Sequence, residues 1–161
     1  MVKKKKIINI LLAAILLITL NFLFILNGCS NSNSTDTVVE EETNSLKNIY
    51  QRFIESGKPS ILVFSYDADC CATTKAFFDD YNGTSKKILE DYKSKFNTLF
   101  INTGILDKNN MNTAIDIATQ NEVLYLPSIL ILDKTGKAYK VIKGLFDEAE
   151  TRIVLDEMLN D

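Results

Sequence analysis

The stretch Ser60–Phe78, SILVFSYDADCCATTKAFF, constrains the fold of this chain more than any other segment. It opens with the uninterrupted apolar run ILVF, which is typical of a short strand buried on both faces. Asp67 and Asp69 follow, and both favour a helix start over a continued strand. The adjacent residues Cys70 and Cys71 therefore fall where a buried strand gives way to a helix N-terminus. Unpaired backbone N–H groups and the helix dipole favour a thiolate there, so we predict a thiol site at this junction.

Composition limits the other kinds of site. The chain has 161 residues, of which 46% are hydrophobic and 24% charged, enough for one ordinary globular domain. It contains no histidine, which excludes Ser-His-Asp and Cys-His catalysis and the usual histidine-containing zinc sites. It contains no tryptophan, and no basic cluster accompanies its Phe and Tyr residues, so we predict no nucleic-acid binding. No cofactor is predicted.

The N-terminus predicts export. Four lysines, Lys3–Lys6, precede a segment without charge that extends to Gly28, and residues 1–28 together are typical of a signal peptide. The segment ends in ILNGC, which resembles the bacterial lipobox, whose cysteine receives diacylglycerol and becomes the new N-terminus. The resemblance implies lipidation of Cys29 and a position at the outer face of the bacterial cytoplasmic membrane. The alternative is an uncleaved membrane helix, since the apolar run is long enough to supply the ~20 residues needed to span a bilayer.

Residues 29–44 are polar and without a sustained period, which predicts a flexible tether. Without residues 1–28, which hold four lysines and no acid, 14 basic residues remain against 21 acidic ones and the net charge is −7. An acidic domain gains no affinity from anionic lipid headgroups, so membrane attachment would depend on the lipid anchor.

The rest of the chain predicts a single domain over residues 45–161. Ser45 can cap a helix that begins at Leu46, and Gly57 can end it. Asn82-Gly83 predicts a break between the cysteine-bearing helix and a second helix. The further predicted elements are strands at 98–102, 128–132 and 137–142, a turn at 133–136, and helices at 84–96, 111–120 and 152–159. Parallel strands joined by helices and followed by a hairpin predict an α/β sandwich with a mixed sheet of about four strands.

From Ser45 to Leu159 the chain resembles a thioredoxin-fold domain, a three-layer α/β/α sandwich. A strand, a short acidic loop and a cysteine motif at a helix start match the family's first signature. The segment VLYLPSILILDKTG, residues 123–136, resembles the second signature, which is a cis-proline before a strand and a glycine turn. The resemblance implies that the Leu126–Pro127 peptide is cis, faces the cysteines and binds substrate.

The cysteine motif departs from the family's Cys-x-x-Cys. Aligned without a gap, Cys70 takes the nucleophile position and Thr73 replaces the second cysteine. With one residue inserted in the preceding loop, Cys71 takes the position, Thr74 replaces the partner and can offer a hydroxyl hydrogen bond.

The burial pattern of the following helix favours Cys71. The gapped alignment buries Phe77 and Tyr81, whereas the ungapped one buries Asp79 or Asp80. Many family members also place a buried acid beneath the site, and here Phe64 holds that position. The resemblance therefore leaves proton transfer to Asp67, Asp69 or water.

A bridge between Cys70 and Cys71 would be strained. Neighbouring Cα atoms lie ~3.8 Å apart across a trans peptide, below the ~4.4 to 6.8 Å of ordinary disulfides. Strain makes such a bridge easily reduced, which suits an oxidant or a sensor. The alternative is that one cysteine packs under the helix and the other acts alone.

Three functions follow from these patterns. The first is thiol-disulfide exchange with protein thiols or disulfides of the cell envelope, where oxidised cysteines persist. The second is a thioredoxin-like module that holds peptides beside Pro127 without redox turnover. The third is a vicinal dithiol that binds a soft metal ion, although no dedicated metal site is predicted.

Overall fold

The structure, a computed structural model, describes residues 45–160. The predicted signal peptide, Cys29 and the predicted tether lie outside the described residues. The described elements are α3 (Leu46–Glu55), β1 (Ser60–Ser65), α4 (Ala72–Tyr92), β2 (Asn97–Asn102), α5 (Lys108–Gln120), β3 (Ser128–Leu132), β4 (Ala138–Lys143) and α6 (Glu148–Asn160). Within this part of the chain, no helix combines the length and the apolar character needed to cross a membrane.

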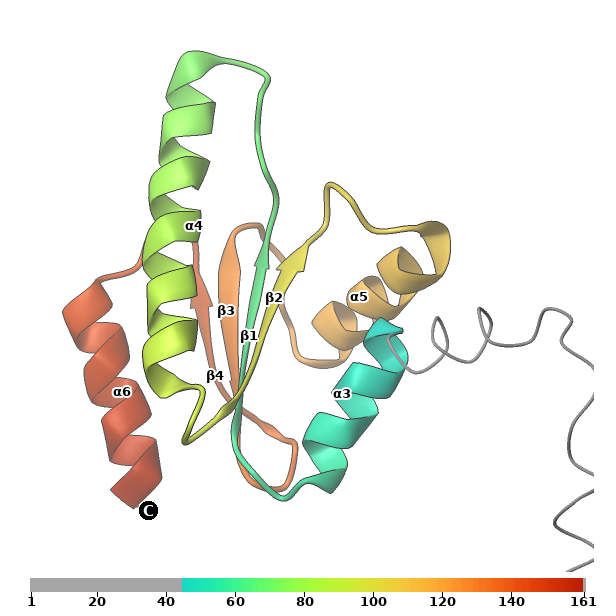
Figure 1. Cartoon of the computed structure of the whole chain (residues 1–161), viewed down its shortest axis with the longest axis vertical. Helices are drawn as coiled ribbons and strands as arrows, with labels where there is room; N and C mark the ends of the chain where they lie inside the picture. Colours follow the sequence, from blue (N-terminus) through green and yellow to red (C-terminus); the bar gives the residue numbers. More distant parts are fainter. Residues whose placement is uncertain (1–44, 161) are drawn as a thin grey trace, which may run out of the picture. The chain divides into compact units, whose positions relative to one another are not determined.

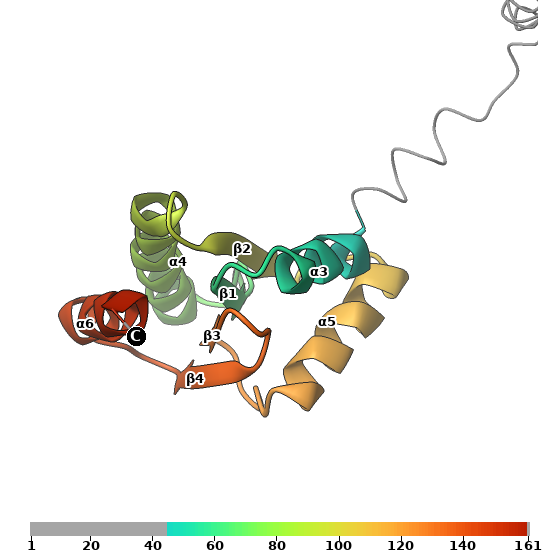
Figure 2. The same ribbon diagram turned by 90° about the horizontal axis from the view of Figure 1, so that it is seen from below.

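The four strands form one mixed sheet in the order β2-β1-β3-β4. β1 pairs with β2 in parallel and with β3 in antiparallel, and β3 and β4 form an antiparallel hairpin. Figures 1 and 2 show α4 and α6 on one face of the sheet and α3 and α5 on the other. This is the predicted three-layer α/β sandwich.

Side chains of the central strands alternate between two apolar cores, as the pleat of a strand requires. On β1, Ile61 and Val63 pack in the core beneath α4 and α6. Leu62 and Phe64 pack in the opposite core, beneath α3 and α5. Every residue of β1 and β3 is buried, which explains why both strands appear in the sequence as unbroken apolar runs.

The two ends of α3 follow the predicted capping chemistry, and α5 has a cap that was not predicted. The Ser45 hydroxyl accepts a hydrogen bond from the backbone N–H of Asn48, and Gly57 has a φ of 64° just after α3 ends. Asp107 caps α5 through the N–H groups of Asn109 and Asn110, so α5 begins three residues before the predicted Met111. The structure thus confirms the α3 boundaries and lengthens α5.

The predicted break at Asn82-Gly83 is wrong, because α4 continues through both residues. Asn82 is buried and hydrogen-bonded to the end of β1, while Gly83 is exposed. A single glycine costs a helix only about 1 kcal/mol relative to alanine, and tertiary contacts outweigh this cost.

Candidate thiol site and apolar pocket

Both cysteines are free thiols at the exposed start of α4. Cys71 is the N-cap residue, with extended backbone angles of φ −160° and ψ 158°. Its carbonyl oxygen accepts a hydrogen bond from the Lys75 N–H at 2.9 Å, which starts the helix. The sulfur of Cys71 therefore lies beside the unpaired N–H groups of the first helical turn, as the sequence predicts.

Thr74 supplies the closest side-chain contact of this thiol. Cys71 Sγ and Thr74 Oγ1 are 3.0 Å apart. Hydrogen bonds from the side chain and the backbone of Thr74 lower the pKa of Cys71 below its ordinary value, and a smaller contribution comes from the Cys70 side chain. The predicted contact with Thr74 is present, and the arrangement favours the thiolate of Cys71.

The nearby Lys75 forms an ion pair with a carboxylate. Lys75 Nζ lies 2.6 Å from Asp79 Oδ2. This ion pair raises the pKa of Lys75, and the charges of Asp67 and Asp69 raise it further. The only basic residue between positions 66 and 80 therefore faces acids, and the surroundings of the thiols carry a net negative charge.

A buried polar network holds the base of the cysteine loop. Asn82, which is 4% exposed, accepts a hydrogen bond from Ser65 Oγ at 2.6 Å. Its amide nitrogen donates to the Tyr66 carbonyl and to Asp67 Oδ1, both at 3.2 Å. Asn102, at the end of β2, donates to the other Asp67 oxygen at 2.7 Å. Both oxygens of Asp67 thus accept hydrogen bonds from amides, while Asp69 in the same loop is exposed and not part of this network.

From the sequence, Asn82 predicts only a helix break. The Asn-Gly pair gave the wrong signal, because its turn preference does not reveal a buried amide. A polar residue one position after Tyr81, on the face that packs against β1, is the signal that would identify it.

The helix face that packs on the sheet agrees with the Cys71 alignment in part. Tyr81 is buried and Asp79 and Asp80 are exposed, as that alignment requires. Phe78 is buried where Phe77 was expected, and its ring lies 4.2 Å from the ring of Tyr66. The role of either thiol in a reaction stays a prediction.

The Leu126–Pro127 peptide is cis, as predicted. Pro127 lies level with the end of β1, because the next residue, Ser128, pairs with Phe64. Asn82 is at the same level through its hydrogen bond to Ser65.

Cys71 lies far from this level, at the N-terminal end of α4. It precedes Asn82 by about three helical turns, so at 1.5 Å per residue it lies about 16 Å beyond the end of β1. Figure 1 shows the N-terminal turns of α4 projecting past the strands. The structure therefore does not bring the cysteines against Leu126 and Pro127, and the expectation that they face each other is corrected.

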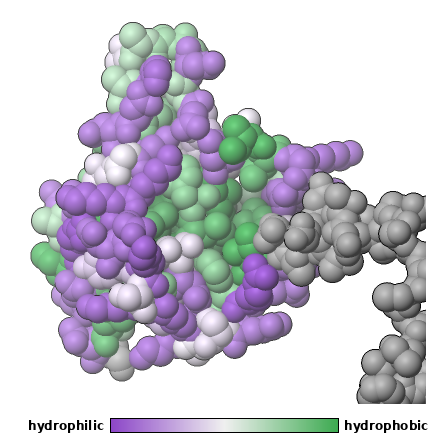
Figure 3. Space-filling model, viewed as in Figure 1, coloured by the Kyte–Doolittle hydropathy of each residue, from purple (hydrophilic) through white to green (hydrophobic). Residues whose placement is uncertain are grey.

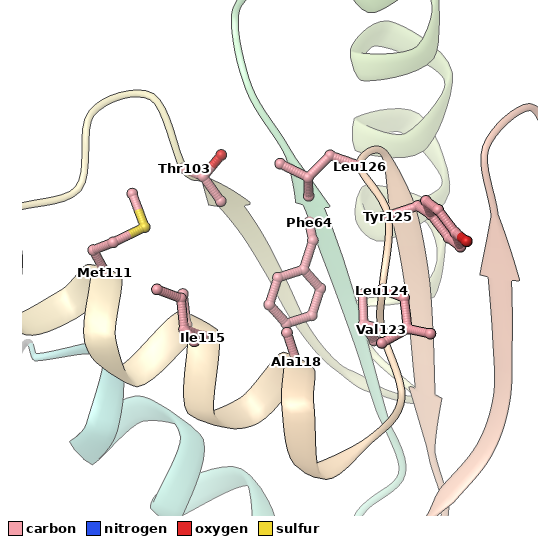
Figure 4. A pocket seen from close by; sticks show the side chains of 10 residues that line it. Phe64, Thr103, Met111, Ile115, Ala118, Val123, Leu124, Tyr125 and Leu126 are labelled. Atoms are coloured by element: carbon pink, nitrogen blue, oxygen red, sulfur yellow. The ribbon is translucent and has the colours of Figure 1, made fainter.

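An apolar pocket lies beside the cis peptide instead. Its volume is about 370 Å³, and Phe64 forms part of its wall between α5 and the segment before Pro127 (Figure 4). The full lining is Phe64, Thr103, Met111, Ala114, Ile115, Ala118, Val123, Leu124, Tyr125 and Leu126. Figure 3 shows hydrophobic residues gathered over this part of the molecule.

Most of these residues were not singled out in the sequence. The available signal was the apolar run Val123–Leu126, which lies in a loop and follows neither a helical nor a strand pattern. Among residues 45–160, no group of three or more Cys, Asp or Glu side chains is placed to hold a metal ion.

Comparison with known proteins identifies the fold. No family model and no curated protein matches the chain. The structure of thioredoxin from Trypanosoma brucei brucei is 16% identical over 73% of this chain and 88% of that one, with a TM-score of 0.51. The chain has a thioredoxin-like fold. The germline-specific thioredoxin Deadhead of Drosophila melanogaster is 18% identical over 70% of this chain and 93% of that one, with a TM-score of 0.47. A designed protein is 19% identical over 71% of this chain and 87% of that one, with a TM-score of 0.49.

Within this thioredoxin-like fold, the site has two parts. The thiols occupy the projecting end of α4, and the apolar pocket lies level with the sheet. A polar network at Asn82 separates them along the helix.

Proposed function

We propose that this protein carries out thiol-disulfide exchange through Cys71, at the outer face of the bacterial cytoplasmic membrane, held there by a lipid on Cys29. The observation that supports the reaction best is the exposed Cys71 sulfur at a helix N-cap, 3.0 Å from the Thr74 hydroxyl. The thiolate is the nucleophile in disulfide exchange, and hydrogen bonds that favour it increase its population.

In the proposed step, the Cys71 thiolate attacks one sulfur of a substrate disulfide. A mixed disulfide forms between Cys71 and that sulfur, and the other substrate sulfur leaves as a thiolate. Cys70 is the nearest second thiol, but a bridge between neighbouring residues is strained. The mixed disulfide is therefore cleaved either by an external thiol or by Cys70, which would form a transient Cys70–Cys71 bridge and release the substrate as a thiol.

The reaction is tested with a small model disulfide such as oxidised glutathione. We expect the wild type and Cys70→Ser to form the mixed disulfide and Cys71→Ser to lose most of the rate. If Cys70→Ser loses the fast thiol and Cys71→Ser keeps it, the assignment of the nucleophile is wrong. If both cysteines react no faster than a free cysteine, exchange through this site is rejected.

The anchor is tested separately in a bacterial host. Replacing Cys29 by Ser should release or misprocess the exported protein while its domain stays folded. A Cys29→Ser protein that is still lipidated and membrane-bound would contradict the proposed anchor.

One observation favours a second candidate, a peptide-binding module without redox turnover. The apolar pocket includes Phe64 near the end of β1, and Cys71 lies about 16 Å beyond that end, measured along α4, so the pocket can be occupied without any contact to sulfur. Peptide binding that is unchanged in the double variant Cys70→Ser/Cys71→Ser, together with unreactive thiols in the wild type, would favour this candidate.

A further inference from the structure

The apolar pocket and its rim form a surface suited to one large apolar side chain. The pocket measures about 370 Å³, at the lower end of the ~300 to 1,000 Å³ common for ligand sites. At the rim, Leu124 is 68% exposed and Leu126 is 44% exposed. Thr103 is the only lining residue with a polar side chain besides Tyr125, and its hydroxyl already donates to the Ser65 carbonyl. The pocket therefore favours an apolar group with few polar atoms.

The surface between this pocket and the thiols is negatively charged. The loop that joins β1 to Cys71 exposes two carboxylates, Asp67 and Asp69. Lys75, the only base in this region, is already paired with Asp79. A ligand that extends from the pocket to the thiols would gain affinity from positive charge.

The distance between the two parts sets the length of such a ligand. Cys71 lies about 16 Å beyond the level of Pro127 along α4. An extended chain covers at most about 3.3 to 3.6 Å per residue, so at least about five residues are needed to span that distance.

We propose that the partner is an extended, cationic segment of a disulfide-containing protein, which places a large apolar side chain in the pocket at least five residues from the cysteine that reacts with Cys71. This inference rests on the proposed function and specifies its substrate class. The apolar side chain docks against Phe64 and α5, the basic residues lie along Asp67 and Asp69, and the disulfide reaches the end of α4. The Cys71 thiolate then attacks the partner's disulfide, forming a mixed disulfide and releasing the second partner sulfur as a thiolate.

The test uses synthetic peptides whose single cysteine is disulfide-bonded to glutathione. Each contains one Leu, separated from the cysteine by two, five or eight residues that include lysines. We expect the peptides with the five-residue and eight-residue spacings to react about tenfold faster than the shortest, because only they can bury their Leu in the pocket while the disulfide reaches Cys71; tenfold corresponds to ~1.4 kcal/mol. Replacing the peptide lysines by glutamates should slow the reaction, and added salt should reduce that difference.

Two variants of the protein address the pocket. Ala118→Trp fills the pocket with a larger side chain. Leu124→Asp changes only an exposed residue at its rim, so this variant still tests the pocket if Ala118→Trp fails to fold. Both should remove the advantage of the longer peptides and leave the rate with oxidised glutathione unchanged. Ile153→Trp on α6, which adds similar bulk at an exposed site away from the pocket lining, is the matched control and should change neither rate.

The outcomes separate this inference from the proposed function. If oxidised glutathione reacts but all three spacings react equally, or if Leu124→Asp retains the spacing effect, the proposed partner is wrong and exchange through Cys71 stands. If neither oxidised glutathione nor any peptide reacts, the proposed function fails and this inference fails with it.

Discussion

The sulfur of Cys71 and the hydroxyl oxygen of Thr74 are 3.0 Å apart across the first turn of α4. Among residues 45–160, no basic side chain is paired with this thiol, since the nearby Lys75 is bonded to Asp79. Local hydrogen bonds, more than a neighbouring cation, therefore favour the thiolate.

Replacing Thr74 by Val tests this relationship. Loss of the hydroxyl removes the largest interaction that lowers the pKa of Cys71, so the pKa should rise and the thiolate fraction at neutral pH should fall. We expect alkylation of Cys71 to slow several-fold near pH 7 and to match the wild type at a pH above both pKa values. Alkylation rates from pH 5 to 11 in a Cys70→Ser background give the measurement. Thr73→Val is the control, and an equal shift in that variant would contradict a specific role of Thr74.

Asn82→Leu tests the polar network at the base of the cysteine loop. The variant leaves Ser65 Oγ and the Tyr66 carbonyl without their Asn82 partner in a buried region. Each such loss costs ~1 to 3 kcal/mol, so the free energy of unfolding should fall by at least that amount. Denaturant unfolding measures it. Asn112→Leu, at an exposed site on α5, should change stability by less than about 0.5 kcal/mol, and similar losses in both variants would show that the network adds no stability.

Removing the hydroxyl group should have opposite effects on the stability of the protein at two tyrosines, Tyr81 and Tyr92. Among the described residues, the buried hydroxyl of Tyr81 has no hydrogen-bond partner, and burial raises its pKa. The Tyr92 hydroxyl donates to Asp156 Oδ1 at 2.9 Å. Tyr81→Phe should therefore stabilise the protein by about 1 kcal/mol and Tyr92→Phe should destabilise it by a similar amount. Thermal and denaturant unfolding of both variants provide the comparison, and a destabilised Tyr81→Phe would reveal a partner for that hydroxyl.

Gly83→Ala should stabilise α4. Gly83 is exposed in the helix interior, and a Cβ placed there has no neighbouring atom within 4 Å. Alanine improves helix propensity by about 0.8 to 1.0 kcal/mol at such a site. Gly136→Ala is the contrasting variant, because φ is 79° and the new Cβ would lie 2.5 Å from Ile54 Cδ1, so we expect it to lose stability. A destabilised Gly83→Ala would mean that the helix needs flexibility at this point.

The sheet could be predicted from the sequence because burial on both faces leaves a simple pattern. The predicted strand at residues 128–132 agrees with β3, and the parallel β1–β2 pair follows from the helix between them. The cis peptide before Pro127 was predicted from the resemblance of residues 123–136 to a known motif. Local sequence determines these features, so one chain is sufficient to recognise them.

The arrangement of the site could not be predicted in the same way. The distance from Cys71 to Pro127 depends on how many turns of α4 extend beyond the sheet. That number is fixed by the contact between Asn82 and Ser65, a pair 17 residues apart. The Asn82-Gly83 pair also favours a turn locally, and the tertiary hydrogen bonds of Asn82 oppose that preference. The pocket likewise requires α5 and the segment before Pro127 to enclose Phe64, which no local pattern specifies.

In the sheet formed by the described strands, β4 occupies one end of the order and pairs with β3 alone. Lys140 and Lys143 on this strand are exposed, and its pairing with β3 shifts register near Leu132. A second chain that approached this edge would meet two ammonium groups and an irregular series of backbone donors and acceptors, both of which oppose intermolecular strand pairing. This edge therefore resists aggregation into extended sheets.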